Sequence, residues 1–116
     1  MENEFEIDDI SRKGIIKKEK LNKMKQAIWN NKVLAESNTT KVVEGNYYFP
    51  PTSINKEFFK EISNKSTCPW KGIASYYDII VEDNTNFGAA WCYKQSKDKA
   101  KEIKGYFAFW KGVEIK

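Results

Sequence analysis

Short apolar and aromatic runs, separated by turn-forming residues, fill the chain from about residue 24 to residue 116. Each run has the length of a strand, and asparagine, glycine and proline mark the ends. A hairpin is predicted over 25–36, because Asn30-Asn31-Lys32 is a turn signal and asparagine tolerates positive φ. A second hairpin is predicted over 73–93, around a turn at 83–86. This pattern predicts a mostly antiparallel β domain, folded or rolled rather than flat.

Helical signals are few and short. Ser53 or Asn55 is expected to cap a short helix over 56–62, and Ser96 is expected to cap a charged one over 97–102. The predicted fold class is therefore mainly β, a compact domain with one or two short helices.

Residues 1–23 differ in composition from the rest of the chain. Their acidic residues come first and their basic residues follow, and Phe5 is their one aromatic residue. Few apolar groups are available there to offset the entropy of ordering, so we expect a charged, flexible N-terminal extension. The domain itself is predicted over 24–116.

The sequence contains no histidine and two isolated cysteines, Cys68 and Cys92. Without histidine, serine–histidine and cysteine–histidine catalysis are excluded. Two single thiols do not supply the ligands of a structural zinc site, and we expect neither a metal nor a cofactor. No segment resembles a secretory signal or a membrane span, so the expected location is the cytoplasm, where both thiols would be free.

The net charge of +4 is mild. The lysines from Lys94 to Lys104 form the densest basic stretch, but Asp98 and Glu102 interrupt it. A charged surface helix is the simplest interpretation, and nucleic acid is not the expected partner.

Aromatic residues form the first candidate constellation. Trp70, Trp91 and Trp110 lie at turns or strand ends, and tyrosines such as Tyr48 and Tyr76 accompany them. Such rings suit either a core or a small-ligand pocket. Tryptophan is too large to bury every edge, so we expect at least one ring to face a cleft.

The loop Cys68-Pro69-Trp70-Lys71-Gly72 is the second constellation. Its lysine could present a point charge to an anion, or lower the pKa of Cys68. The alternative is a structural turn with a solvated lysine, which we favour over a reactive thiol.

Acidic residues near the predicted second hairpin form the third constellation. Asp78 and Glu82 share a strand face by the period of two, and Asp83 points the other way. Two carboxylates on one face could hold magnesium for nucleotidyl transfer. A solvated strand face is the simpler interpretation, because no phosphate-binding loop accompanies them.

Several motifs follow one another in a characteristic order along 24–116. They are Ala27-Ile28-Trp29-Asn30, Val43 to Pro50, Thr67 to Gly72, Ala74-Ser75-Tyr76-Tyr77, Ala89 to Tyr93, and Ile103 to Val113. As a set, these motifs resemble the domain of unknown function 427 (DUF427) family, which is also catalogued as nucleotidyltransferase-like.

The resemblance implies a β-tent-like fold of two packed, roughly orthogonal antiparallel sheets, in a version without the paired CxxC motifs of zinc-bearing relatives. Some domains of that fold bind small ligands in an aromatic cage. The sequence departs from the family pattern at Cys92, where an aromatic residue is expected, and at Lys94, where a proline is expected.

Three functional hypotheses follow. The first is a small-ligand-binding domain whose pocket is formed by Trp70, Lys71, Tyr76, Trp91, Trp110, Glu44 and Tyr48. The second is a magnesium-dependent nucleotidyltransferase-like enzyme using Asp78, Glu82 or Asp83. The third is a protein-interaction module that uses the arm 1–23. The sequence identifies no ligand, no catalytic residue and no oligomeric state.

Overall fold

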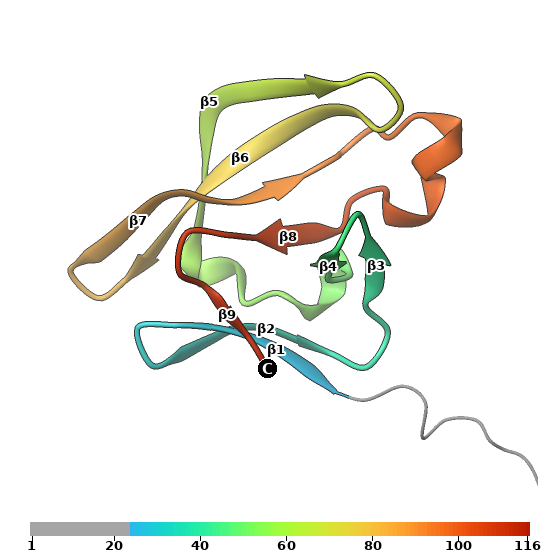
Figure 1. Ribbon diagram of the computed structural model, residues 1–116. Coiled ribbons are helices and arrows are strands. Elements are labelled where there is room, and N and C mark those ends of the chain that lie inside the picture. The colour runs from blue at the N-terminus through green and yellow to red at the C-terminus, as the bar shows by residue number, and fades with distance from the viewer. Residues whose placement is uncertain (1–23) are drawn as a thin grey trace, which may run out of the picture.

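The computed structural model describes residues 24–116 (Figure 1). The predicted extension over 1–23 lies outside the described residues. Nine strands and three short 3₁₀ turns make up the described chain, and none of its helices is long and apolar enough to cross a membrane. The predicted mainly-β class is thus confirmed, and every strand pairing is antiparallel.

The strands form three sheets, where the resemblance implied two. The three-stranded sheet has the order β2-β1-β9 and comprises β1 (Lys25–Trp29), β2 (Lys32–Ser37) and β9 (Glu114–Ile115). The β3–β4 hairpin comprises β3 (Lys41–Val43) and β4 (Asn46–Tyr48). The four-stranded sheet has the order β5-β6-β7-β8 and comprises β5 (Phe59–Cys68), β6 (Gly72–Val81), β7 (Asn84–Cys92) and β8 (Phe107–Phe109).

The first predicted hairpin is confirmed. Asn30 and Asn31 have φ of 52° and 63°, the left-handed values that a tight turn between β1 and β2 requires. The last strand returns to this hairpin, and Ile115 pairs with Ala27. The two ends of the domain are therefore joined in one sheet (Figure 1).

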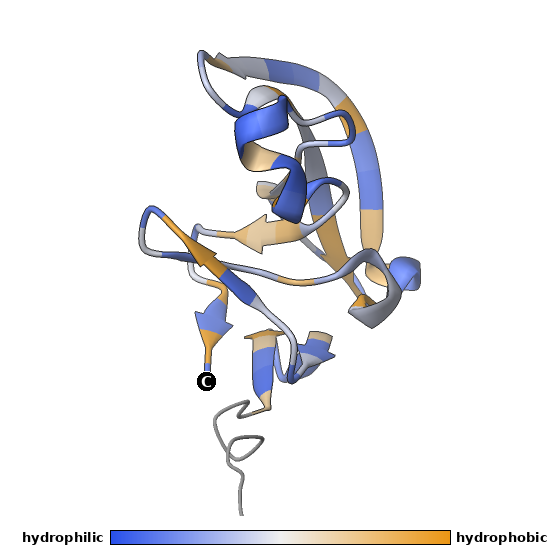
Figure 2. Ribbon diagram, turned by 90° about the vertical axis from the view of Figure 1, so that its right-hand side faces the viewer, coloured by the Kyte–Doolittle hydropathy of each residue, from blue (hydrophilic) through white to orange (hydrophobic). Residues whose placement is uncertain are grey.

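The predicted helix over 56–62 is wrong. A single 3₁₀ turn, η4 (Lys56–Phe58), is followed directly by β5, in which Phe59 pairs with Ile79 of β6. Backbone pairing with β6 satisfies the hydrogen bonds that a helix would otherwise have made, so tertiary context overrides the local spacing of apolar residues. Figure 2 shows how hydrophilic β5 is compared with the apolar β8.

The second predicted helix, over 97–102, is present as 3₁₀ structure, η5 (Asp98–Ile103), one residue further along the chain. A third 3₁₀ turn is η3 (Pro51–Ser53). Lys97, not Ser96, occupies the N-cap position, and it makes no side-chain cap. The Ser96 hydroxyl is buried and has no hydrogen-bond partner within residues 24–116. The predicted second hairpin exists, but its turn is tighter than expected, because β7 already begins at Asn84.

The core has two parts. One contains Leu34, Phe49 and Ile79, all fully buried, together with Cys92. The other contains Tyr48, Tyr93 and Ile103, with Trp91 and Tyr76 packed against it. Neighbouring residues of β7 thus enter different clusters, because side chains alternate between the two faces of a strand.

Candidate functional site

Four of the predicted pocket rings form one continuous cluster, which we call the aromatic cluster: Tyr48, Tyr76, Trp91 and Trp110. The pairing of Tyr76 on β6 with Trp91 on β7 brings two of them side by side. The ring centroids of Trp91 and Trp110 are 5.8 Å apart, and those of Tyr76 and Trp110 are 6.4 Å apart. Tyr48 meets Trp91 edge-on at 6.2 Å. The rings are therefore not scattered through the fold.

Each polar ring edge in the aromatic cluster has a partner. The indole N–H of Trp91 donates to the Tyr48 hydroxyl at 3.2 Å, and that of Trp110 donates to the Gly88 carbonyl at 2.6 Å. The Tyr76 and Ser66 hydroxyls are 2.8 Å apart. These bonds fix the orientation of the rings. Because their polar edges are paired, the ring surface that stays available for other contacts is apolar.

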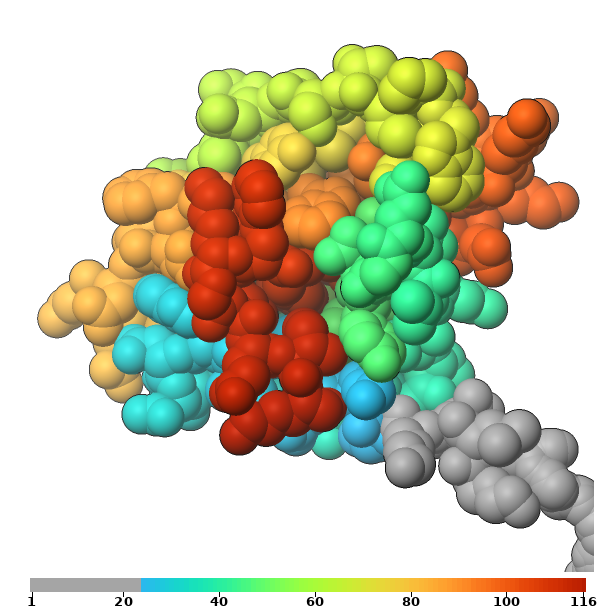
Figure 3. Space-filling view, viewed as in Figure 1, coloured from blue at the N-terminus to red at the C-terminus, as the bar shows by residue number. Residues whose placement is uncertain are grey.

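The residues of the aromatic cluster differ in how far they are exposed to solvent. Trp110 is 47% exposed, whereas Tyr48 is completely buried and its burial raises its pKa. Tyr76 and Trp110 line a hollow of about 200 Å³ together with Lys111 and Ile62. Figure 3 shows a separate recess in the surface between the β3–β4 hairpin and the chain after β8, with β7 at the bottom; no residue of that hairpin lines the 200 Å³ hollow.

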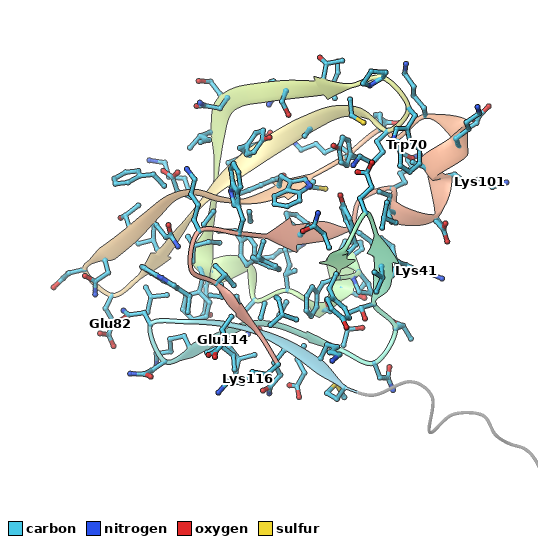
Figure 4. All side chains as sticks on the ribbon, viewed as in Figure 1. Lys41, Trp70, Glu82, Lys101, Glu114 and Lys116 are labelled. Atoms are coloured by element: carbon cyan, nitrogen blue, oxygen red, sulfur yellow. The ribbon has the colours of Figure 1, made fainter. Side chains whose placement is uncertain are left out.

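The other three predicted residues form a second group, which we call the Glu44 group: Glu44, Trp70 and Lys71. The β3–β4 turn presents Glu44 with φ of 53°, followed by Gly45 with φ of 81°. Lys71 donates to one oxygen of this carboxylate, and the Trp70 indole donates to the other at 3.2 Å. Figure 4 labels Trp70 beside this turn.

Charge in the Glu44 group is locally balanced. The hydrogen bond from Lys71, and then that from Trp70, lowers the pKa of Glu44. Burial works to lower the pKa of Lys71, but the Glu44 carboxylate and the nearby Tyr48 and Tyr93 prevail and raise it. The ammonium also lies 5.4 Å and 5.5 Å from the ring centroids of Trp70 and Tyr93. Lys71 is thus a buried cation held by a carboxylate and two rings.

The loop that carries Lys71 is clamped by backbone contacts. Gly72 has φ of 117° and forms a bridge with Ser96. The Lys97 amide donates to the Lys71 carbonyl at 3.0 Å, and its ammonium donates to the Pro69 carbonyl at 2.6 Å. The prediction of a solvated lysine at position 71 is therefore wrong: the residue is 6% exposed.

The acidic constellation is dispersed. Asp78 is buried, and its carboxylate accepts the Gly88 amide at 2.8 Å where the β6–β7 register shifts. Glu82 lies in the β6–β7 turn with φ of 55°, on the opposite side of the domain from Trp70 in Figure 4. No three residues of the types His, Cys, Asp or Glu within 24–116 come together as a metal site. The Asp78 carboxylate has a structural role at a β-bulge.

The sequence analysis did not predict a second cavity, of about 500 Å³. It is lined mainly by Ile54, Phe59, Tyr77, Cys92 and Phe107, with Glu61, Lys94 and Lys56 among its charged residues. The alternation of side chains along β7 and just beyond it could have indicated this cavity, because Cys92 and Lys94 face away from Trp91. The two positions at which a departure from the family pattern was expected, Cys92 and Lys94, therefore lie at this cavity, and not at the rim of a pocket formed by Trp91.

The described residues form a small antiparallel β domain with anchored aromatic rings at its surface. The chain belongs to the family described as Domain of unknown function (DUF427), whose model matches residues 17–115. The match begins within the segment that we assigned to the extension. No curated protein matches the chain.

Proposed function

We propose that the domain binds a small planar molecule on the exposed rings of the aromatic cluster. Trp110, Tyr76 and Trp91 would be the walls, and Trp70 would extend the apolar surface toward the β3–β4 turn. The observation that carries the proposal is the 47% exposed Trp110 ring, held against two other aromatic rings. Exposed aromatic surface of this kind is typical of binding sites.

The Glu44 group supplies the polar contact in this proposal. The side chain of Glu44 is 51% exposed, and each of its oxygens already accepts one hydrogen bond. A carboxylate oxygen has a second lone pair, so Glu44 can still accept a donor from a ligand. Lys71 and Tyr48 are positioning residues, because one holds Glu44 and the other holds the Trp91 ring.

Saturation-transfer NMR with a library of planar heteroaromatic fragments tests the proposal. Trp110→Ala should weaken the bound fragments by about two- to ten-fold, the equivalent of one lost ring contact. Trp29→Phe is the matched control, because Trp29 packs against the other core cluster and its substitution should leave binding unchanged. The proposal fails if no fragment binds, or if both variants bind every fragment like the unaltered protein.

The nucleotidyltransferase alternative finds less support. Of its three carboxylates, Asp78 is occupied by the Gly88 amide, and the remaining two lie at the β6–β7 turn. A thermal-shift measurement with ATP and magnesium addresses it, since a bound nucleotide must raise the unfolding temperature. The interaction-module alternative concerns 1–23, which lie outside the described residues.

A further inference from the structure

The 500 Å³ cavity lies on the side of β7 opposite the aromatic cluster. The segment that follows β4 lines it with Pro51 and Ile54, and Gly105 lines it ahead of β8. Its volume is within the range of small-molecule sites, roughly 300–1,000 Å³. Because Cys92 and Trp91 point to opposite faces, the cavity is separate from the site proposed above.

Three aromatic rings pack against one another in the apolar wall of the cavity. Ring centroids of Tyr77 and Phe107 are 5.0 Å apart, and Phe59 meets them at 6.3 Å and 5.5 Å. All three contacts are edge-to-face. Cys92 is 2% exposed, and burial raises the pKa of its thiol to about 12, so it contributes a neutral, apolar surface.

The charged rim of the cavity has an excess of cations. Lys94 donates to both oxygens of Glu61 at 2.6 Å, and Lys56 is a second, exposed ammonium. The side chains of Lys94 and Glu61 are 49% and 39% exposed. An exposed ion pair contributes only about 0–1 kcal/mol, so Lys94 can be drawn to another anion at little cost.

We propose that this cavity binds a small aromatic carboxylate. Its apolar body would lie against Phe59, Tyr77 and Phe107, and its carboxylate would lie between Lys56 and Lys94. Glu61 then competes with the ligand for the Lys94 ammonium. Loss of the Lys94 charge should therefore weaken binding of the carboxylate, whereas loss of the Glu61 charge should strengthen it.

The probe is 2-naphthoate, and its neutral amide and 2-naphthylmethylamine are the matched comparisons. Chemical-shift titration of the full chain should show naphthoate binding most tightly and the amine most weakly. Shifts should concentrate on residues that line the cavity. The proposal is overturned if none of the three binds at millimolar concentration, or if the amine binds as tightly as the carboxylate.

Substitutions of the exposed rim test the charge assignment without disturbing the core. Lys94→Gln and Lys56→Gln should each weaken naphthoate by about two- to five-fold, and Glu61→Gln should strengthen it by a similar factor. The neutral amide should bind all three variants equally. Lys101→Gln, on the outer side of η5, is the lysine control (Figure 4). Unchanged naphthoate affinity in both Lys94→Gln and Glu61→Gln would refute the proposal.

The two proposed sites can fail independently. Trp110→Ala should leave naphthoate affinity unchanged, because Trp110 does not line this cavity. If Trp110→Ala removes naphthoate binding, the ligand occupies the aromatic cluster and the proposal for the cavity is wrong.

Discussion

Gly72→Ala is expected to be among the most damaging single-atom additions in the domain. Gly72 opens β6 with φ of 117°, a value that L side chains rarely adopt. A Cβ atom there would lie 3.0 Å from the Gln95 carbonyl oxygen and 3.6 Å from the Lys97 nitrogen. Both neighbours are backbone atoms, so neither can move aside by changing a rotamer.

The magnitude follows from two separable costs. The strained backbone conformation costs about 1–3 kcal/mol by itself. The close contact adds about 1–3 kcal/mol, the usual cost of overpacking. Gly112→Ala is the control, because Gly112 has φ of 86° but no atom within 4 Å of the added Cβ. It should show only the first cost.

Urea unfolding followed by tryptophan fluorescence measures both variants. Gly72→Ala should lose more unfolding free energy than Gly112→Ala, at an unchanged m-value. It should also displace Lys71 from Glu44, because the amide of Lys97 binds the Lys71 carbonyl. Equal stability of the two variants would refute the argument that the loop is clamped against the chain at Gln95.

Two further predictions concern titratable groups. The folded-state pKa of Glu44 is depressed, so its ion pair stabilises the fold above the ordinary pKa of 4.5 and loses that effect as the pH falls through the folded-state pKa. Urea unfolding from pH 7 to pH 3 should therefore show a smaller acid-side loss for Glu44→Gln than for the unaltered protein, whereas Glu57→Gln should retain the full loss. The second prediction concerns thiol reactivity: at pH 8, iodoacetamide should alkylate the partly exposed Cys68 and leave the buried Cys92 unmodified until urea is added. Mass spectrometry of the modified peptides checks this, and rapid labelling of Cys92 in the folded protein would contradict its burial.

Local signals were sufficient for the hairpins. Asn30-Asn31 carries its own conformational preference, so the sequence alone predicts the β1–β2 turn. The segment 56–62 has no comparable conformational preference, since the spacing of its apolar residues fits a helix and a strand alike. The partner strand β6, distant in sequence, decides in favour of β5.

The site residues also divide into those that local sequence signals bring together and those that depend on contacts between distant segments. Trp91 and Tyr76 could be placed together because both lie in one predicted hairpin. The contact between Glu44 and Lys71 spans 27 positions and depends on how the β3–β4 turn approaches the loop before β6. The 500 Å³ cavity needs the segment after β4, the long strand β5 and Gly105 at once, so no single sequence motif predicts it.

Strand β7 separates the two proposed sites, and the alternation of its side chains determines which residues face each of them. Trp91 and Tyr93 face the cluster around Tyr48, whereas Cys92 belongs to the cluster around Phe107. Cys92 and Lys94, where the resemblance implied an aromatic residue and a proline, both line the 500 Å³ cavity and not the aromatic cluster. An aromatic side chain at position 92 would fill the floor of that cavity, and a proline at position 94 would remove a rim cation. The proposed carboxylate site therefore depends on the small thiol and the lysine of this chain, whereas the aromatic cluster depends on neither.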